Sequence, residues 1–326
     1  MNKDQASISS SKSIAVLPFV NMSADPDNEY FSDGITEEII NALTTILGLK
    51  VISRTSCFAF KGRNVDIRKI GDQLGVATLL EGSVRKAQNR IRITAQLISS
   101  ADGAHLWSKN FDREMDDIFA LQDEISLLIA DQIRENFGHL EIDDRLIETP
   151  EIDVDVYQLY LKGRYYLHKF NKSDIERGIS ILEQVVDRKP DYALAHVSIH
   201  YGYNMMAAGG LAPVEEALNT GKRHLDIAKQ LDDQLPEYYH SLGWHSLNED
   251  WDFTSATQYL LKAIELRPGY ADAHQKLFIN LALEGKLDAA FEHIEMARNL
   301  DPLATLNNYF TGYYYCLLYT SPSPRD

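Results

Sequence analysis

The sequence predicts an α/β (α+β) domain with a mixed sheet, followed by an all-α solenoid of stacked helical hairpins. The first observation behind this is an alternation of apolar and polar residues over 79–113, interrupted by two turn signals. The second is a set of βα units ahead of that stretch, and the third is an internal repeat in the second half of the chain. With 326 residues, the chain is long enough for two domains with a core in each.

The stretch 79–113 predicts a meander of three antiparallel strands. Within it, RIRITAQLI alternates polar and apolar residues, so one face of the middle strand is apolar. A tight turn is expected at Gln88-Asn89, where asparagine tolerates a positive φ, and a second turn at Asp102-Gly103.

The elements before and after the meander follow from shorter apolar patterns. We expect Asp33 to cap a helix, which places Glu37 and Glu38 in its first turn, near the positive end of the helix dipole. The full prediction is strands at 13–19 and 49–53, helices from Asp33, at 66–74 and at 116–137, and the three meander strands, in the order β-α-β-α-β-β-β-α.

An ordered set of motifs runs through this half of the chain: SIAVLPF, DGITEEI, the Arg-Thr-Ser of 54–56, LLEGSVR, RITAQLI and DGAHLWS. Together they resemble a bacterial family related to the TolB amino-terminal region and to FlgO, over about 13–137. The resemblance implies a small α/β domain that commonly precedes tetratricopeptide repeats. It also implies that a nucleotide-cyclase, winged-helix DNA-binding or protein-kinase domain often lies upstream in such proteins.

The second half of the chain repeats itself. Pro268 and Pro302 are 34 residues apart, which is the tetratricopeptide period, and Ala290 and Ala297 fall at the small positions where two helices touch. We expect four repeats and the first helix of a fifth. The predicted organisation is a linker at 1–12, the α/β domain at 13–138, a linker at 139–154, the repeats at 155–315 and a tail at 316–326.

The tail, CLLYTSPSPRD, has the sequence of a sequencing adapter translated in frame. We therefore expect the biological sequence to stop at Tyr315, with the fifth repeat cut off midway. The alternative is a natural tail rich in proline and serine. In the first case Cys316 is foreign, and Cys57 is left as a single free cysteine.

Composition restricts the class of partner. The net charge of −16 argues against non-specific nucleic-acid binding and against attraction to anionic membranes. No apolar run is long enough for a membrane span, and we expect a cytoplasmic protein, or a periplasmic one if an export or membrane segment lies upstream. Oligomeric state is not predicted.

No catalytic set, metal site or cofactor is predicted. His196 and His200 have the i, i+4 spacing of metal ligands, but Val197 occupies the place of the zincin glutamate, so helix packing is favoured. Arg54 lies near Cys57 and could lower its thiol pKa, although a lone cysteine is more often a core residue.

Two surfaces are candidates for binding. Stacked helix pairs leave a concave groove lined by the first helix of each pair, and aromatic and amide side chains there suit an extended peptide. The residues expected to face this groove are Tyr160, Arg164, Tyr201, Asn204, His240, Trp244, Asn248 and Gln275, although some of them could instead pack repeat against repeat. The second surface is the polar face of the meander, with Arg85, Arg90, Arg92 and Gln96, for which an ordinary solvated face is the simpler interpretation.

These patterns predict a non-catalytic bacterial regulatory or scaffold protein that binds a protein or peptide partner through its repeats. A second hypothesis is the C-terminal regulatory part of a signalling enzyme, such as a class III adenylate or guanylate cyclase, or of a winged-helix transcriptional regulator. A third is an envelope-assembly protein, by analogy with TolB and FlgO. Fold alone does not choose among them.

Overall fold

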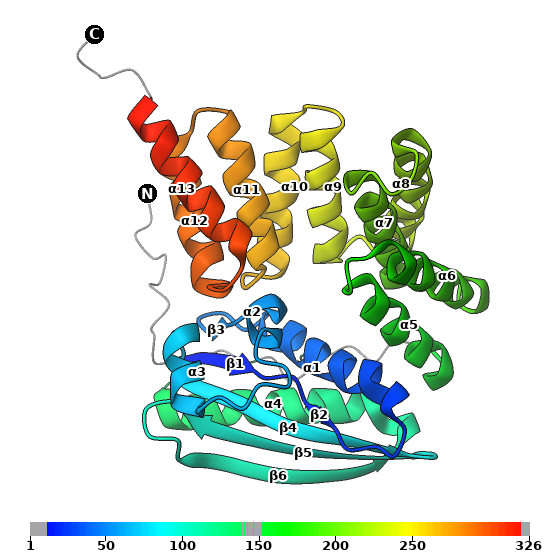
Figure 1. Cartoon of the computed structure of the whole chain (residues 1–326), viewed down its shortest axis with the longest axis vertical. Coiled ribbons are helices and arrows are strands. Elements are labelled where there is room, and N and C mark those ends of the chain that lie inside the picture. The colour runs from blue at the N-terminus through cyan, green and yellow to red at the C-terminus, as the bar shows by residue number, and fades with distance from the viewer. Residues whose placement is uncertain (1–11, 139, 141, 143–145, 147–151, 321–326) are drawn as a thin grey trace.

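The computed structural model describes residues 12–138, 140, 142, 146 and 152–320. Below, residues 12–138 are called the sheet part and residues 152–320 the helical part; the helical hairpins lie above the sheet part in Figure 1. The sheet has the strand order β3-β1-β4-β5-β6, with β2 paired to β4. Its strands are β1 Ser13–Val16, β2 Val20–Asn21, β3 Lys50–Val51, β4 Thr78–Ala87, β5 Arg90–Ser99 and β6 His105–Glu114.

The predicted meander is confirmed as β4, β5 and β6, which pair antiparallel. The strands β1, β2 and β3 join it through parallel pairings, so the sheet is mixed as expected. The first turn differs in one detail, because Gln88 takes the positive φ of 52° that we assigned to Asn89. A two-residue turn can place the left-handed conformation at its first position, and this one does.

Four helices accompany the sheet: α1 Glu29–Leu43, α2 Arg54–Phe58, α3 Ile67–Leu74 and α4 Ile118–Phe137. Two short 3-10 turns, η1 Pro26–Asn28 and η2 Met115–Asp117, precede α1 and α4. The sequence did not predict α2 or β2. The prediction that Asp33 caps α1 was wrong, because the helix begins at Glu29 and Asp33 lies inside it, bonded to Lys61 Nζ at 2.6 Å.

The two faces of the sheet are covered differently. Leu80 and Leu97 are directly paired and buried on one face, in a core that includes α1 and α4 residues. Leu79 and Ile98 are buried on the opposite face, where α3 approaches through Gly71. The rest of that second face carries the polar side chains of the meander.

The helical part consists of helix pairs followed by a last helix. Within a pair the helices approach closely; a Cβ on Gly163 would lie 2.6 Å from Leu182 Cγ, so glycine is needed there. The predicted small positions Ala290 and Ala297 are fully buried. The helices are α5 Val154–Leu167, α6 Lys172–Arg188, α7 Ala193–Ala208, α8 Val214–Leu231, α9 Pro236–Asn248, α10 Phe253–Leu266, α11 Ala271–Leu283, α12 Leu287–Leu300 and α13 Thr305–Thr320.

The apolar core is divided unevenly along the chain. A large cluster joins the sheet part to α5, α6 and α7, and a second cluster holds α10 to α13 together. Between them lies a small cluster, here called the joint, formed by Val197, Leu225, Ala228 and Tyr238. The helices α5, α6 and α7 therefore share a core with the sheet, whereas α10 to α13 have their own.

Candidate functional site at the concave face of the hairpins

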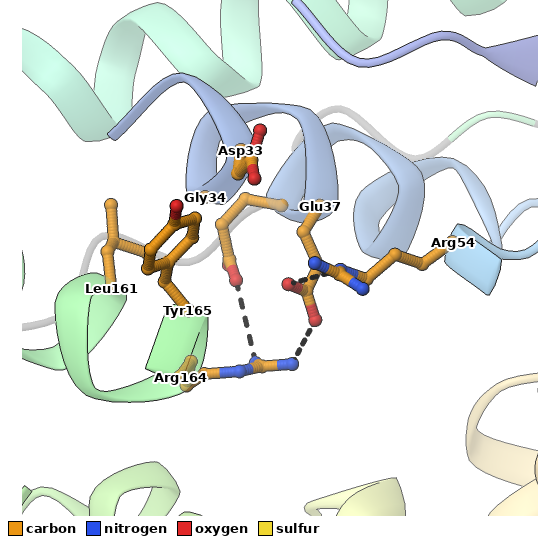
Figure 2. Close-up of a pocket in the computed structure, with 8 residues that line it drawn as sticks. Asp33, Gly34, Glu37, Arg54, Leu161, Arg164 and Tyr165 are labelled. Carbon is orange, nitrogen blue, oxygen red and sulfur yellow. Dashed lines mark hydrogen bonds and ion pairs between the residues drawn. The ribbon is translucent and has the colours of Figure 1, made fainter. Parts of the chain in front are cut away.

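The centre of the molecule contains an ion cluster that connects α1 with the first hairpin. The carboxylate of Glu37 accepts hydrogen bonds from Arg54 Nε at 3.1 Å and from Arg164, and His168 Nε2 lies 3.4 Å away. Glu38 Oε1 lies 3.8 Å from Arg164 Nη1. Figure 2 shows the two arginines reaching Glu37 from opposite sides. These five residues are called the Glu37 cluster below.

The pKa values of the two neighbouring carboxylates of the cluster are shifted in opposite directions. Burial alone would raise the pKa of Glu37, but Arg164, His168 and Arg54 outweigh it and hold the pKa well below its usual range. Burial raises the pKa of Glu38 to about 7, and its partial attraction to Arg164 does not compensate. Glu37 is therefore a fixed negative charge, while Glu38 changes charge near neutral pH.

Packing around the Glu37 cluster leaves almost no free space. The cavity lined by Asp33, Gly34, Leu161 and the cluster has a volume of about 10 Å³, which is the space of one water molecule. A Cβ on Gly34 would come within 2.9 Å of the Leu161 side chain, so α1 and α5 approach closely here. We conclude that the cluster fastens the first hairpin to α1 and does not hold a ligand.

A second polar group lies at the base of α9 and α11. Glu237 Oε1 accepts from Arg267 Nη2 at 2.7 Å, and the His240 ring lies beside the Tyr270 ring with centroids 5.1 Å apart. Among the described residues, Glu237 Oε2, Arg267 Nε and His240 Nε2 are buried without a hydrogen-bond partner. Buried polar atoms are normally paired, so water or a bound molecule is expected to contact them.

Further along the helices, the concave face presents Tyr201, Trp244 and Lys276. Lys276 Nζ lies 3.7 Å above the centre of the Trp244 ring, a cation–π contact. Tyr201 is 39 % exposed, yet burial raises the pKa of its hydroxyl to about 12. Burial likewise lowers the pKa of Lys276. The three residues lie on α7, α9 and α11, the first helices of successive hairpins, which line the concave side of a stacked-hairpin solenoid. This set is called the concave face below.

The structure distributes the other predicted groove residues differently. Tyr160 is buried and accepts a hydrogen bond from Arg164 Nη1 at 3.0 Å, while Arg164 itself is engaged by Glu37. Gln275 is buried, and its amide donates to Asn307 Oδ1 on α13 at 2.7 Å. Asn204 lies 2.8 Å from His200 Nε2 through its side-chain nitrogen, and Asn248 donates to the Trp244 carbonyl at 2.8 Å. Tyr160 and Gln275 are thus buried, and their polar atoms bind other residues of the protein.

The predicted docking surface on the meander is a polar face by register. Arg85 is paired with Arg92, and the latter donates to Asp112 on β6, as does Arg90. Gln96 is half-buried on the same face. Two of its cations are thus already bound to a carboxylate, which agrees with an ordinary solvated face.

The histidines of the helical part and the cysteine of the sheet part have structural surroundings. His196 Nδ1 faces His224 Nδ1 at 3.0 Å, and the repeat-related pair His274 and His293 has the same contact at 3.0 Å. In the described part of the chain no three metal-ligating residues cluster. Cys57 is fully buried, and burial raises the pKa of its thiol. The suggestion that Arg54 activates it was wrong, because Arg54 is bound to Glu37.

Sequence reasoning missed several important residues. Glu37 and Glu38 were assigned to a helix N-terminus, and Lys276 was not singled out at all. No local pattern around Lys276 indicated its contact with Trp244, which lies 32 residues earlier on the first helix of the preceding hairpin. The Arg-Thr-Ser motif was noticed, and its arginine does belong to the Glu37 cluster.

No helix in the described part of the chain has both the length and the apolar composition needed to cross a membrane. Paired helices stacked along the chain, with Pro268 and Pro302 34 residues apart, form a helical solenoid of the tetratricopeptide type.

Comparison with known proteins gives two kinds of relative. Residues 10–128 match the family described as the second domain of HilA/YgeH-like transcriptional regulators. Putative adenylate cyclase 3 of Rhizobium meliloti (strain 1021) is 45% identical over 187 residues, which are 57% of this chain and 32% of that protein. The transcriptional regulator HilA of Salmonella typhimurium is 23% identical over 296 residues, 89% of this chain and 51% of that protein. The chain thus spans about a third and about half of the length of these relatives.

Among solved structures, the thermophilic tetratricopeptide protein TTC0263 of Thermus thermophilus matches with a TM-score of 0.42 and 15% identity, covering 62% of this chain and 96% of that one. YrrB, a tetratricopeptide protein described with an unusual peptide-binding site, matches with a TM-score of 0.36 and 18% identity, covering 52% and 78%.

Proposed function

We propose that this chain is a protein-interaction module whose concave face binds an extended segment of a protein partner. The observation that carries the proposal is the set of Tyr201, Trp244 and Lys276 on the first helices of successive hairpins, which combines aromatic area with a cation stacked on a ring. Aromatic rings supply most of the contact energy in such surfaces, and the exposed Asn248 on the same helix can reach a peptide backbone.

We further infer that the module works as a regulatory part of a larger protein. The curated relatives are longer than this chain, and their names refer to a cyclase and to a transcriptional regulator. In this interpretation the sheet part is the TolB- and FlgO-like domain predicted from the motifs, and it links the repeats to the rest of the protein. In this proposal the chain contributes binding, and any catalytic or DNA-binding activity belongs to the rest of the larger protein.

The test uses the full chain and a pair of tryptophans. Trp244 lies on the concave face, whereas Trp251 is 69 % exposed on the turn between α9 and α10. A partner captured from a bacterial lysate is identified, purified and titrated calorimetrically against the wild type, Trp244→Ala, Tyr201→Ala and Trp251→Ala.

We expect Trp244→Ala to weaken binding by about 30-fold, the effect of a hot spot of about 2 kcal/mol, and Tyr201→Ala to weaken it as well. Trp251→Ala serves as the control, with affinity close to the wild type. Equal affinities of Trp244→Ala and Trp251→Ala would reject the concave face as the binding surface.

A further inference from the structure

The far end of the helical part is fastened to the sheet part by a small group of buried polar contacts. Ser56 donates from its main-chain nitrogen to Asp301 Oδ1 at 3.1 Å, and its hydroxyl also bonds that carboxylate. The same hydroxyl accepts from the Leu303 nitrogen at 2.8 Å, and the Ser53 nitrogen donates to the Leu300 carbonyl at 2.8 Å. These residues, from α2 and from the loop between α12 and α13, are called the latch.

The latch buries a charge among neutral groups. Asp301 is 3 % exposed, and burial raises its pKa although Ser56 donates to it. The hydrogen bonds that it accepts from Ser56 come from a neutral residue, whereas a buried charge is normally offset by a cation. A second contact nearby, from the Gly269 nitrogen to the Thr44 carbonyl, measures 3.3 Å, which is long for a hydrogen bond. The far end is therefore held by specific but weakly stabilised contacts.

The near end is held much more firmly. The helices α5, α6 and α7 share the large apolar cluster of the sheet part, and the Glu37 cluster adds ion pairs. Between the two ends, α9 meets α7 and α8 through the four-residue joint. A body with one firm end, one weak end and a small joint between them opens at the weak end first.

We propose that the latch gates the concave face: when Asp301 leaves Ser56, the helices α9 to α13 swing about the joint away from α1 and α2. This inference rests on the proposed function for its purpose, because Trp244 and Lys276 move with α9 and α11, whereas Tyr201 stays with the sheet part. Opening widens the recess between these two sets of residues, so a partner segment binds the open form more tightly and shifts the population toward it.

The opening is measured without any partner, so its failure is distinguishable from failure of the proposed function. Spin labels on cysteines at Lys69 and Glu292, exposed residues of α3 and α12, report the distance across the latch by pulsed electron spin resonance in a Cys316→Ser background. Labels at Lys69 and Gln184, the latter on α6, form a reference pair that lies within the firm end.

The opening variant is Ser56→Ala combined with Asp301→Ala. Its matched control is Asp232→Ala, which alters the residue that ends α8 as Asp301 ends α12, but without a contact to α2. We expect the opening variant to add a longer distance for the first label pair and none for the reference pair, while the control resembles the wild type. If the opening variant remains helical and the distance distribution of the first label pair is unchanged, the proposal is overturned. An equal change in the distances of both label pairs would overturn it as well.

A complementary test closes the latch. A Cβ on Gly269 would lie 3.0 Å from Thr44 Cβ, so Thr44→Cys with Gly269→Cys brings two thiols within disulfide reach after a small adjustment. Oxidation should remove the longer distance from the opening variant, and reduction should restore it. A longer distance that persists after oxidation would contradict the swing.

Hydrogen exchange on the unmodified latch provides a measurement that does not depend on the folding of variants. The amides of Ser53, Ser56 and Leu303 donate across the latch, so they should exchange together and faster than buried amides of α1. Oxidation of the engineered disulfide should slow them. Exchange of these three amides at the rate of α1 would contradict a latch that opens on its own.

Discussion

Replacing Glu38 by glutamine should stabilise the protein at neutral and alkaline pH. The usual pKa of this carboxyl is 4.5, and burial raises it to about 7. The folded chain therefore binds the proton more tightly than the unfolded chain. Wild-type stability must fall as pH rises from about 4.5 to about 7, and the loss is complete above that range.

The size of the stabilisation follows from the usual and the raised pKa values of Glu38. Each factor of ten in proton affinity corresponds to about 1.4 kcal/mol, so the difference amounts to about 3 kcal/mol. The Glu38 side chain is 20 % exposed, so solvent screening reduces this figure only modestly. Glutamine has the shape of the protonated acid and avoids the cost of burying the charge.

The assay is urea unfolding followed by circular dichroism at several pH values between about 4 and 8. We expect Glu38→Gln to match the wild type near pH 4 and to exceed it by up to about 3 kcal/mol near pH 8. The adjacent Glu37→Gln is a control of opposite sign, because the lowered pKa of Glu37 means that its charge stabilises the fold at neutral pH. A difference between Glu38→Gln and the wild type that does not vary with pH would refute this account of the Glu37 cluster.

Three other substitutions test separate parts of the structure. Arg164→Ala leaves Glu37 buried with fewer cations and should lower the free energy of unfolding, measured with urea, by about 3–5 kcal/mol. The control Arg90→Ala, at an exposed ion pair, should lower it little. Similar losses for the two variants would contradict the burial of the Glu37 cluster. Burial lowers the pKa of His274 to about 4. The stability of the wild type should therefore fall as pH drops from about 6.5 to about 4. Melting temperatures measured across this range should fall less for His274→Gln. Gly82→Ala places a Cβ 2.3 Å from a main-chain oxygen of β5 and should destabilise by about 1–3 kcal/mol. In the same thermal assay the control Gly312→Ala, whose Cβ meets nothing within 4 Å among the described residues, should stabilise α13 by up to about 1 kcal/mol.

The sequence predicted the secondary structure well where periodicity was long and regular. The meander strands and the helix that ends at Gly75 follow from strict alternation and from a glycine with φ of 61°. The helix pairs follow from the repeat of small residues and prolines. The start of α1 was misplaced because Asp33 was taken for its cap, although the helix begins one turn earlier at Glu29.

The candidate site was only partly predictable. Counting along the repeats located Tyr201 and Trp244, because the faces of a helix recur with its period. It could not show that Arg164 bonds Glu37 across 127 residues of sequence, or that Ser56 bonds Asp301 across 245. Such contacts depend on how the hairpins settle on the sheet part, and no local pattern encodes that. The adapter origin of the residues after Tyr315 also stays a prediction, since α13 continues to Thr320 and helix formation does not reveal the source of a segment.

The apolar core that runs from the sheet part into α7 should hold the two parts of the protein together even when the chain between them is cut. Tyr157 is 2 % exposed, its ring lies 4.5 Å from that of Phe119, and its hydroxyl accepts from Gln122 Nε2 at 2.9 Å. A peptide bond cut between residues 138 and 152 would therefore leave two fragments that remain together as a complex. Expression of the sheet part alone would instead leave the partners of Tyr157 exposed to water. A piece of this protein that keeps the shared core intact therefore includes α5, α6 and α7 as well as the sheet part.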